Sequence, residues 1–200
     1  MHFIKLSIPA LFALQLLYLP VKAQDQKEAD FKTACTQILE SISKKKLSGL
    51  NGLINTSYGV YVLYRIGVPD EYQLLKKLDG HLPFDISYHT VKATDILKYT
   101  LQYGKLPSYD CGESVWNKKT FMADSVKKYK PVSDIVAFHT KYDGLVLGKK
   151  LKTNIKFIEQ NSRKVIFTGS KGDGIIFYVS YINGKWWLSI IDTVTTDCSA

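Results

Sequence analysis

The chain has few of the residues that form catalytic and metal-binding motifs. Its 200 residues include four histidines and three cysteines, and none of them has the spacing of a zinc site. His81 and His89, with Asp79 and Asp85 close by, lack a fixed ligand spacing. Glycine-rich loops that open a helix, internal repeats and low-complexity tracts are also missing. We therefore expect no metal and no cofactor.

Long apolar runs are absent after the first 23 residues. Leu6–Pro20 is largely apolar, follows the basic Lys5, and is followed by Val21-Lys22-Ala23. This pattern predicts a secretory signal peptide that is cleaved before Gln24. The run is shorter than the roughly 20 residues that a bilayer span needs, and an uncleaved anchor is the alternative. We predict a periplasmic or secreted protein in which residues 24–200 form a single domain with no transmembrane span.

Acidic residues are outnumbered by basic ones, and the net charge is +9. Such a surface suits an anionic partner such as lipid, polysaccharide or nucleic acid. Export argues against nucleic acid. The basic clusters are scattered through the sequence, which favours solvated surfaces over one binding patch. An envelope ligand or protein of unknown identity is the expected partner.

The three cysteines are an odd number for an exported chain, which predicts one disulfide and one spare thiol. Cys35 falls on the apolar stripe of a predicted helix. Cys111 and Cys198 both lie in turn-like sequences. We therefore predict a Cys111–Cys198 disulfide and a buried, inert Cys35.

The sequence predicts an α+β domain in which an N-terminal amphipathic helix packs on an antiparallel sheet. The helix runs from Asp25 to about Leu47, because apolar residues recur there on one face; these are Phe31, Cys35, Ile38, Leu39 and Ile42. Further predicted elements are a strand at Tyr58–Ile66, one or two helical turns at Glu71–Leu78, a loop at Leu106–Trp116, a helix at Ser133–Thr140 capped by Ser133, and a short helix at Asn154–Asn161. Val91–Tyr103 fits either a helix or a pair of short strands, and the strands are slightly favoured.

The C-terminal residues predict a three-stranded meander that opens at Val165–Thr168. Asn183-Gly184 separates two β-prone runs, and this dipeptide favours a type I′ hairpin turn. The turn sets a register in which Tyr181 faces Trp186, Val179 faces Leu188, and Phe177 faces Ile190 on one apolar face.

Two parts of the sequence resemble known proteins. Ile182–Asp192 (INGKWWLSIID) is similar to the terminal hairpin of NTF2-like domains. That resemblance implies a curved sheet that wraps the first helix and forms a cone-shaped pocket. Tyr58–Tyr72 (YGVYVLYRIGVPDEY) and the cleavage region resemble uncharacterised secreted proteins of Bacteroidetes. This second resemblance implies a location in the cell envelope and no known activity.

The mixed face of the terminal hairpin is the candidate ligand site. Tyr178, Trp187 and Lys185 lie on it, and Arg65 of the early strand is expected to share the sheet. Aromatic rings with a cation suit a sugar, a lipid head group or a peptide. The alternative is that a helix covers this face and the rings are core.

Weaker candidates for catalysis are Cys111, His139 and Asp192. A cysteine hydrolase needs a thiol, a histidine and an orienting carboxylate, and these three occur in a usable chain order. Asp110 and Glu113 disfavour a thiolate at Cys111. Asp192 is expected to point toward the apolar face, where its pKa would rise.

The leading hypothesis is an exported non-enzymatic domain that binds a glycan, lipid or peptide of the envelope through its sheet face. A secreted cysteine hydrolase that uses Cys111 and a structural or assembly protein of the cell envelope are the alternatives.

Overall fold

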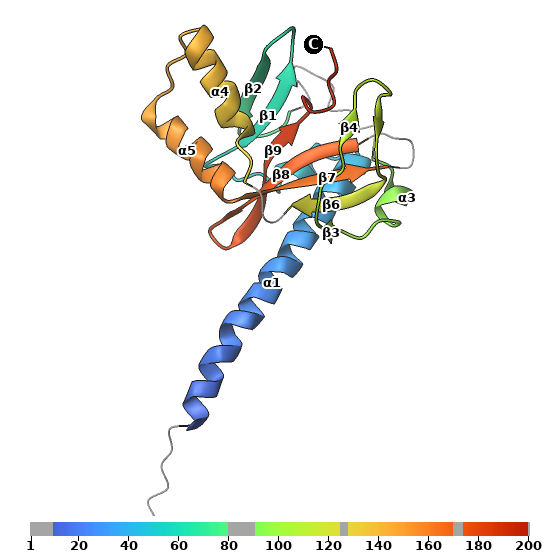
Figure 1. Ribbon diagram of the computed structural model, residues 1–200. Helices are drawn as coiled ribbons and strands as arrows, with labels where there is room; N and C mark the ends of the chain where they lie inside the picture. Colours follow the sequence, from blue (N-terminus) through green and yellow to red (C-terminus); the bar gives the residue numbers. More distant parts are fainter. Residues whose placement is uncertain (1–9, 80–90, 125–127, 170–173, 200) are drawn as a thin grey trace, which may run out of the picture.

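The computed structural model describes residues 10–79, 91–124, 128–169 and 174–199, with side chains from residue 23 onward. Within this part of the chain, one large sheet is covered by helices on both faces (Figure 1). The helices are α1 (Ala10–Ser43), α2 (Leu47–Asn51), α3 (Ala93–Ile96), α4 (Pro131–Tyr142) and α5 (Lys149–Gln160). The strands are β1 (Val60–Arg65), β2 (Asp70–Leu75), β3 (Gln102–Tyr103), β4 (Tyr109–Asp110), β5 (Val115–Trp116), β6 (Thr120–Asp124), β7 (Ser162–Thr168), β8 (Gly174–Ile182) and β9 (Lys185–Asp192).

The large sheet has the strand order β2-β1-β9-β8-β7-β6-β3. β1 runs parallel to β9, and β3 runs parallel to β6, whereas the other neighbours are antiparallel. The α+β class is confirmed, but the sheet is mixed rather than antiparallel. Both parallel pairs join strands that are not consecutive in the sequence. Local sequence patterns indicate pairing only between consecutive strands, so they did not predict these two pairs.

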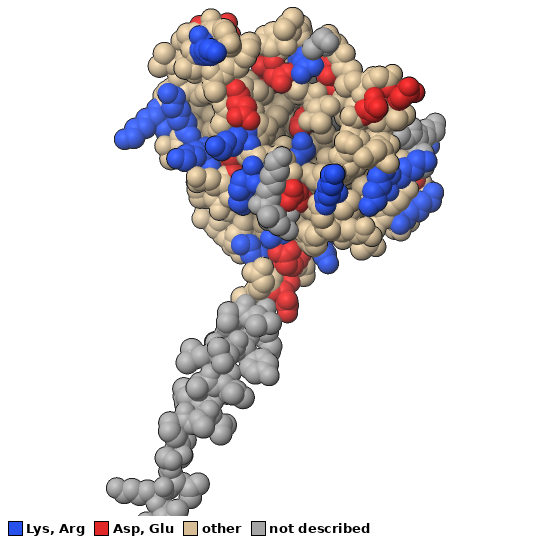
Figure 2. Space-filling model, in the orientation of Figure 1, with Lys and Arg blue, Asp and Glu red and all other residues tan. Residues whose placement is uncertain are grey.

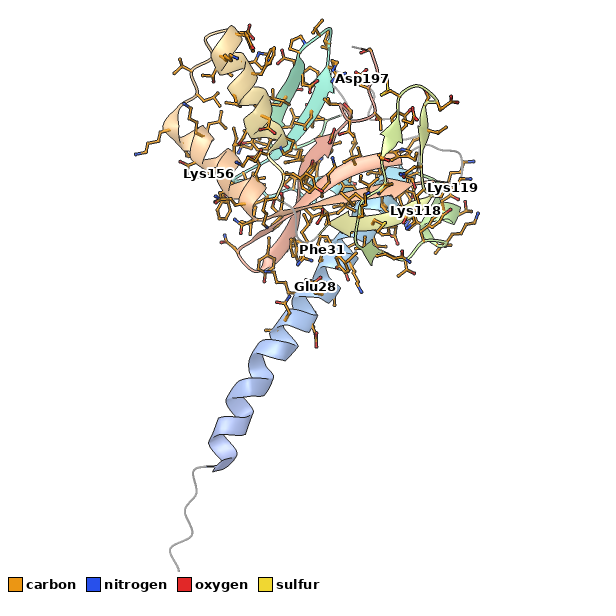
Figure 3. All side chains as sticks on the ribbon, in the orientation of Figure 1. Glu28, Phe31, Lys118, Lys119, Lys156 and Asp197 are labelled. Atoms are coloured by element: carbon orange, nitrogen blue, oxygen red, sulfur yellow. A yellow bond between two sulfur atoms is a disulfide. The ribbon has the colours of Figure 1, made fainter. Side chains whose placement is uncertain are left out.

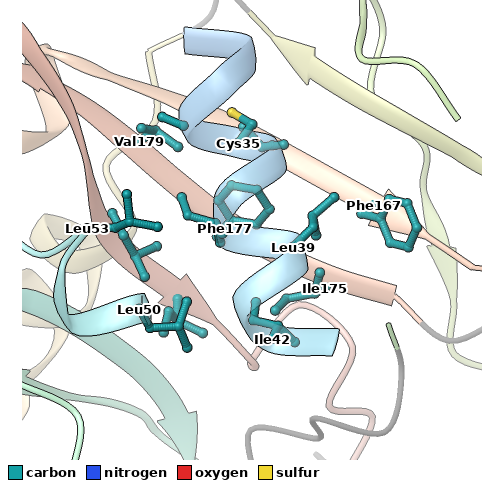
Figure 4. Packing of buried hydrophobic residues seen from close by; sticks show 14 of the residues in the cluster. Cys35, Leu39, Ile42, Leu50, Leu53, Phe167, Ile175, Phe177 and Val179 are labelled. Carbon is teal, nitrogen blue, oxygen red and sulfur yellow. The ribbon is translucent and has the colours of Figure 1, made fainter. Parts of the chain in front are cut away.

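Helix α1 lies across one face of the sheet, as its apolar stripe predicts. The five stripe residues named above are at most 2% exposed. Figure 4 shows Cys35, Leu39 and Ile42 beside Phe177 and Val179 of β8. Because these side chains are removed from water together, each contributes on the order of 1.5–3 kcal/mol to folding. The first part of α1 extends away from the sheet (Figure 1).

The β8–β9 hairpin turns at Asn183-Gly184 as predicted. Asn183 has φ 50° and Gly184 has φ 80°, which are the positive values that a type I′ turn requires. Tyr181 pairs with Trp186, and Val179 pairs with Leu188. The meander β7–β8–β9 is therefore confirmed.

One predicted pair in this hairpin is wrong. A β-bulge between Tyr178 and Val179 leaves Ser189 without a partner residue in the β8–β9 ladder. Phe177 therefore pairs with Ile191 instead of Ile190. Ile190 consequently joins Tyr178 on the opposite face of the sheet, beneath α4 and α5. At the bulge, the hydroxyl of Ser189 donates a hydrogen bond to the Tyr178 carbonyl.

Strand β1 follows its predicted alternation, with Val60 and Val62 on the α1 side and Tyr61 and Leu63 on the other. The helical turns predicted after it are wrong, because Asp70–Leu75 is strand β2. The turn at 66–69 folds the chain back on β1, and pairing along all six residues outweighs local helix propensity.

Two other predictions between β2 and α4 need correction. The favoured pair of strands at Val91–Tyr103 is wrong, because this segment holds the short helix α3, in line with the helical alternative, and only two strand residues at its end. Leu106–Trp116 contains the small β4–β5 hairpin rather than a plain loop. Strand β6 was not predicted, because it is covered on both faces and its residues do not alternate between apolar and polar.

Helices α4 and α5 cover the other face of the sheet. Val132 and Ile135 of α4 and Ile155 and Ile158 of α5 are buried against it. α4 begins at Pro131, where the missing N–H is not needed. Ser133 lies inside the helix, so its predicted role as the cap is wrong.

The Cys111–Cys198 disulfide is present, with the two Cα atoms 5.5 Å apart, and Cys35 is a buried free thiol. The predicted disulfide and the predicted burial of Cys35 are therefore confirmed. A search of the described residues finds no helix with the length and apolarity that a bilayer span needs.

Candidate functional site

The sheet face that the sequence marked as a ligand site is covered. Tyr178 is 1% exposed and lies with Tyr129 in a core beneath α4 and α5. Burial raises the pKa of the Tyr178 hydroxyl. For Tyr178, the alternative prediction is therefore correct: helices cover this face and the ring is part of the core.

Of the other three predicted ligand residues, Lys185 and Trp187 lie together and Arg65 lies far from both. The Lys185 ammonium is 4.1 Å from the Trp187 ring at the start of β9. Arg65 ends β1, two residues beyond Leu63, which pairs with Asp192 at the end of β9. At the rise of a strand, Arg65 and Lys185 are therefore roughly 25–30 Å apart. Arg65 binds the Asp70 carboxylate and the Asp197 carbonyl, so it fixes the C-terminal segment.

The structure does not form a catalytic site from Cys111, His139 and Asp192. Cys111 is in the disulfide, so a hydrolase with this nucleophile is not supported. Asp192 is buried but lies on the α4–α5 side of the sheet because of the β-bulge. It accepts a hydrogen bond from Lys164 of β7, and another from Thr195, which ties the last strand to the C-terminal segment.

His139 joins α4 to β2. Its Nε2 atom is 2.9 Å from the Asp70 carbonyl and 3.4 Å from the Glu71 carboxylate, while Nδ1 contacts the Asp143 carboxylate. The carbonyl of Asp70 is the largest influence that raises the pKa of His139, with Asp143 second. Both ring nitrogens thus have acceptors, which favours the imidazolium and makes His139 a structural contact.

The predicted absence of a metal site falls partly outside the described residues, because His81, Asp85 and His89 lie in the 80–90 segment. Among the residues that are described, no group of three or more potential ligands comes together.

A groove between α4 and α5 is the candidate site. Its volume is about 590 Å³, which is within the range of small-molecule pockets. Apolar side chains from both helices and from the segment between them form its interior: Val136, Ala137, Leu147 and Ile155. We call this hollow the α4–α5 groove.

Lysine side chains surround the α4–α5 groove. Five of them line it, and all are exposed: Lys128, Lys130, Lys141, Lys152 and Lys156. Figure 2 shows lysine side chains gathered over this side of the molecule, and Figure 3 places Lys156 on α5. An apolar interior beside several cations fits a ligand with an apolar chain and an anionic head.

Among the described residues of the groove wall, Glu159 is the one acid. It is 3% exposed, accepts a hydrogen bond of 2.9 Å from the Ser133 N–H, and also accepts one from the Ser133 hydroxyl. Burial raises the pKa of Glu159, while the Ser133 donors oppose that rise. This carboxylate of α5 binds the first turn of α4 and holds the two helices together.

Sequence reasoning missed both the groove and Glu159. One signal was available, since Glu159 occurs at i+4 from Ile155 and directly after Ile158, on the buried face of a helix. A charged residue in such a stripe is a candidate for a buried partner. The lysines gave no comparable signal, because their spacing in the sequence resembles that of any solvated surface.

No protein-family model, curated protein or solved structure matches the chain. The NTF2-like resemblance of the terminal hairpin and the likeness to secreted Bacteroidetes proteins therefore remain predictions.

Proposed function

We propose that this protein is a non-enzymatic binding domain that holds a single-chain anionic amphiphile in the α4–α5 groove. The apolar interior would take the chain, and the surrounding lysines would face the anionic head. The observation that carries the proposal is the combination of an apolar hollow of about 590 Å³ with five exposed lysines around it.

The chemistry of the groove favours this ligand over a neutral sugar. Sugars bind through hydrogen-bonding side chains placed beside aromatic rings. The groove instead presents mainly ammonium groups and aliphatic side chains, and among the described residues that line it Tyr129 is the only aromatic one. The lysines are exposed, so each contact with an anionic head is expected to contribute less than about 1 kcal/mol, and several must act together.

We also propose that the protein acts outside the cytoplasm. The predicted signal peptide supports export, and so does a disulfide, because disulfides persist in oxidising compartments.

A titration with dodecanoate tests the proposed ligand class. Wild-type protein is expected to bind dodecanoate more tightly than dodecanol, and increasing salt is expected to weaken binding. Reversing two charges with Lys152→Glu and Lys156→Glu should lower the affinity for dodecanoate about tenfold. Lys118→Glu with Lys119→Glu makes the same double charge reversal on the other side of the molecule (Figure 3) and is the matched control.

Equal affinities for the Lys152→Glu, Lys156→Glu variant and the Lys118→Glu, Lys119→Glu control would overturn the assignment of the groove. Equal affinities of the wild type for dodecanoate and dodecanol would overturn the anionic head.

A further inference from the structure

Several large apolar side chains are exposed at one end of the molecule. Val68 is 81% exposed in the β1–β2 turn, Tyr142 is 62% exposed at the end of α4, and Val146 is 87% exposed in the segment between α4 and α5. Ile66 and Phe138 are also exposed. We call these five residues the apolar end. Exposed apolar groups that gather in this way mark an interaction surface.

The members of the apolar end come from three segments that lie close together. Val68 and Phe138 line the same hollow of about 460 Å³. The rings of Phe138 and Tyr142 are 4.7 Å apart, as expected for residues four apart on a helix. Figure 1 shows the β1–β2 turn and the last turn of α4 at the same end of the molecule.

Exposed lysines lie beside the apolar end, whereas three of the four acids near it contact a basic side chain. The Lys141 ammonium is 4.8 Å from the Tyr142 ring, and Lys149 and Lys150 are exposed where α5 begins. Three acids lie nearby: Asp70 contacts Arg65, and Glu71 and Asp143 contact His139. Asp134, which is exposed and lines the hollow with Phe138, is a further opposing charge.

We propose that the apolar end is a docking surface for an anionic lipid bilayer. Aliphatic residues at the tip of a turn enter the boundary between head groups and chains, and a tyrosine ring is suited to the head-group level. Lysines beside them face the lipid phosphates. The surface is built from turns and a helix end, so it fits a bilayer better than a partner that inserts a segment.

The docking surface would place the α4–α5 groove next to a bilayer, and this part of the inference rests on the proposed function of the groove. Lys141 stacks on Tyr142 and also lines the α4–α5 groove, and Leu147 of the groove follows Val146 of the apolar end. A docked molecule would therefore have the groove open beside the membrane. The amphiphile is accordingly one that the bilayer supplies or receives.

Vesicle flotation tests the docking surface. Wild-type protein is expected to float with vesicles made of equal parts phosphatidylcholine and phosphatidylglycerol, and much less with phosphatidylcholine alone. The double variant Val68→Ser, Tyr142→Ser should bind the anionic vesicles at least about tenfold more weakly. Lys149→Glu with Lys150→Glu should lower binding by about fivefold or more for each lysine.

Leu97→Ser is the matched control, because Leu97 is 89% exposed at the end of α3, outside the apolar end. It should bind vesicles as the wild type does. Circular dichroism of each variant confirms that the helix content is unchanged. Unaltered vesicle binding by the Val68→Ser, Tyr142→Ser variant would overturn the proposal.

Self-association is a competing use of the same surface. If the wild type is a dimer by light scattering and the Val68→Ser, Tyr142→Ser variant is a monomer, the apolar end joins two copies and the proposal fails. The groove is tested separately by dodecanoate in solution, where the docking variants should keep wild-type affinity. Loss of vesicle binding alone and loss of dodecanoate binding alone are therefore distinguishable.

Discussion

Arg163 on β7 donates hydrogen bonds to both carboxylate oxygens of Glu28 on α1, at 2.8 and 2.6 Å. Its guanidinium also lies 4.7 Å from the Phe31 ring and 4.9 Å from the Trp186 ring. The pair therefore fixes α1 to the sheet within the predicted mature chain. Paired hydrogen bonds of this kind are stronger than those of a single ammonium.

Glu28→Gln is expected to lower the free energy of unfolding by about 1–3 kcal/mol. The amide loses the charge and directs an N–H₂ group toward the guanidinium. Chemical denaturation measures the change. Glu40→Gln is the control, since Glu40 pairs with Lys44 and both side chains are about half exposed, so it should cost less than about 1 kcal/mol. Equal losses would contradict the role of Arg163.

The same pair predicts a pH dependence. Hydrogen bonding by Arg163 lowers the pKa of Glu28 below its usual value of 4.5. The stabilisation is therefore present above pH 4.5 and is lost as the pH falls through the lowered pKa. The stability difference between wild type and Glu28→Gln should shrink in acid. A difference that stays constant down to strongly acidic pH would contradict this.

The cysteines predict a specific labelling result. Native protein should take up no alkylating reagent at Cys35, because burial raises the pKa of its thiol and blocks access. After denaturation without reductant, one thiol per chain should react, and it should map to Cys35. Rapid modification of Cys111 in the native protein would contradict the disulfide and restore the thiol-enzyme hypothesis.

The Cys111–Cys198 bond should also stabilise the fold. It joins residues that are 87 apart in sequence, so replacing both cysteines with serine should cost about 2–4 kcal/mol. Chemical denaturation of the double variant measures the loss. A variant as stable as the wild type would show that the C-terminal segment is held by its other contacts alone.

His139 predicts an opposite pH dependence. Its pKa is raised from 6.5, with the Asp70 carbonyl and Asp143 as the main causes. The stabilisation is thus fully present below pH 6.5 and is lost as the pH rises through the raised pKa. His139→Gln should be less stable than wild type at pH 6 and closer to it in alkali. A difference that grows with pH would contradict this assignment.

Ser133→Ala tests the contact between α4 and α5. Removing the hydroxyl takes one donor from the buried Glu159 carboxylate, so unfolding should become easier by about 1–3 kcal/mol. Thr153→Ala is the control, because Thr153 is an exposed residue of α5 whose hydroxyl bonds only its own helix. Equal stabilities of the two variants would show that Glu159 does not depend on Ser133.

The predictions that succeeded depended on local patterns. The stripe on α1 and the Asn183-Gly184 turn each follow from residues that are neighbours in sequence or a few positions apart. The disulfide was predicted by elimination, because Cys35 belonged to the stripe. The predictions that failed needed longer-range information. Nothing in Glu71–Leu78 specifies an antiparallel partner, and nothing in Tyr58–Ile66 specifies β9 as a parallel neighbour.

The candidate site could not be predicted for the same reason. The register rule assigned Ile190 and Asp192 to the wrong face, because a single bulge residue, Ser189, reverses the alternation.

The groove arises where two helices pack side by side over the sheet. Its lysines come from both helices and from the segment that precedes α4, so their clustering exists only in the folded molecule.

The most direct test of amphiphile binding is to map amide shifts by NMR while dodecanoate is added below its micellar concentration. We expect shifts concentrated at Val136, Ala137, Leu147 and Ile155, with weaker shifts for dodecanol. Shifts that fall mainly on α1 or the terminal hairpin, or no saturable shifts at all, would contradict the assignment of the α4–α5 groove.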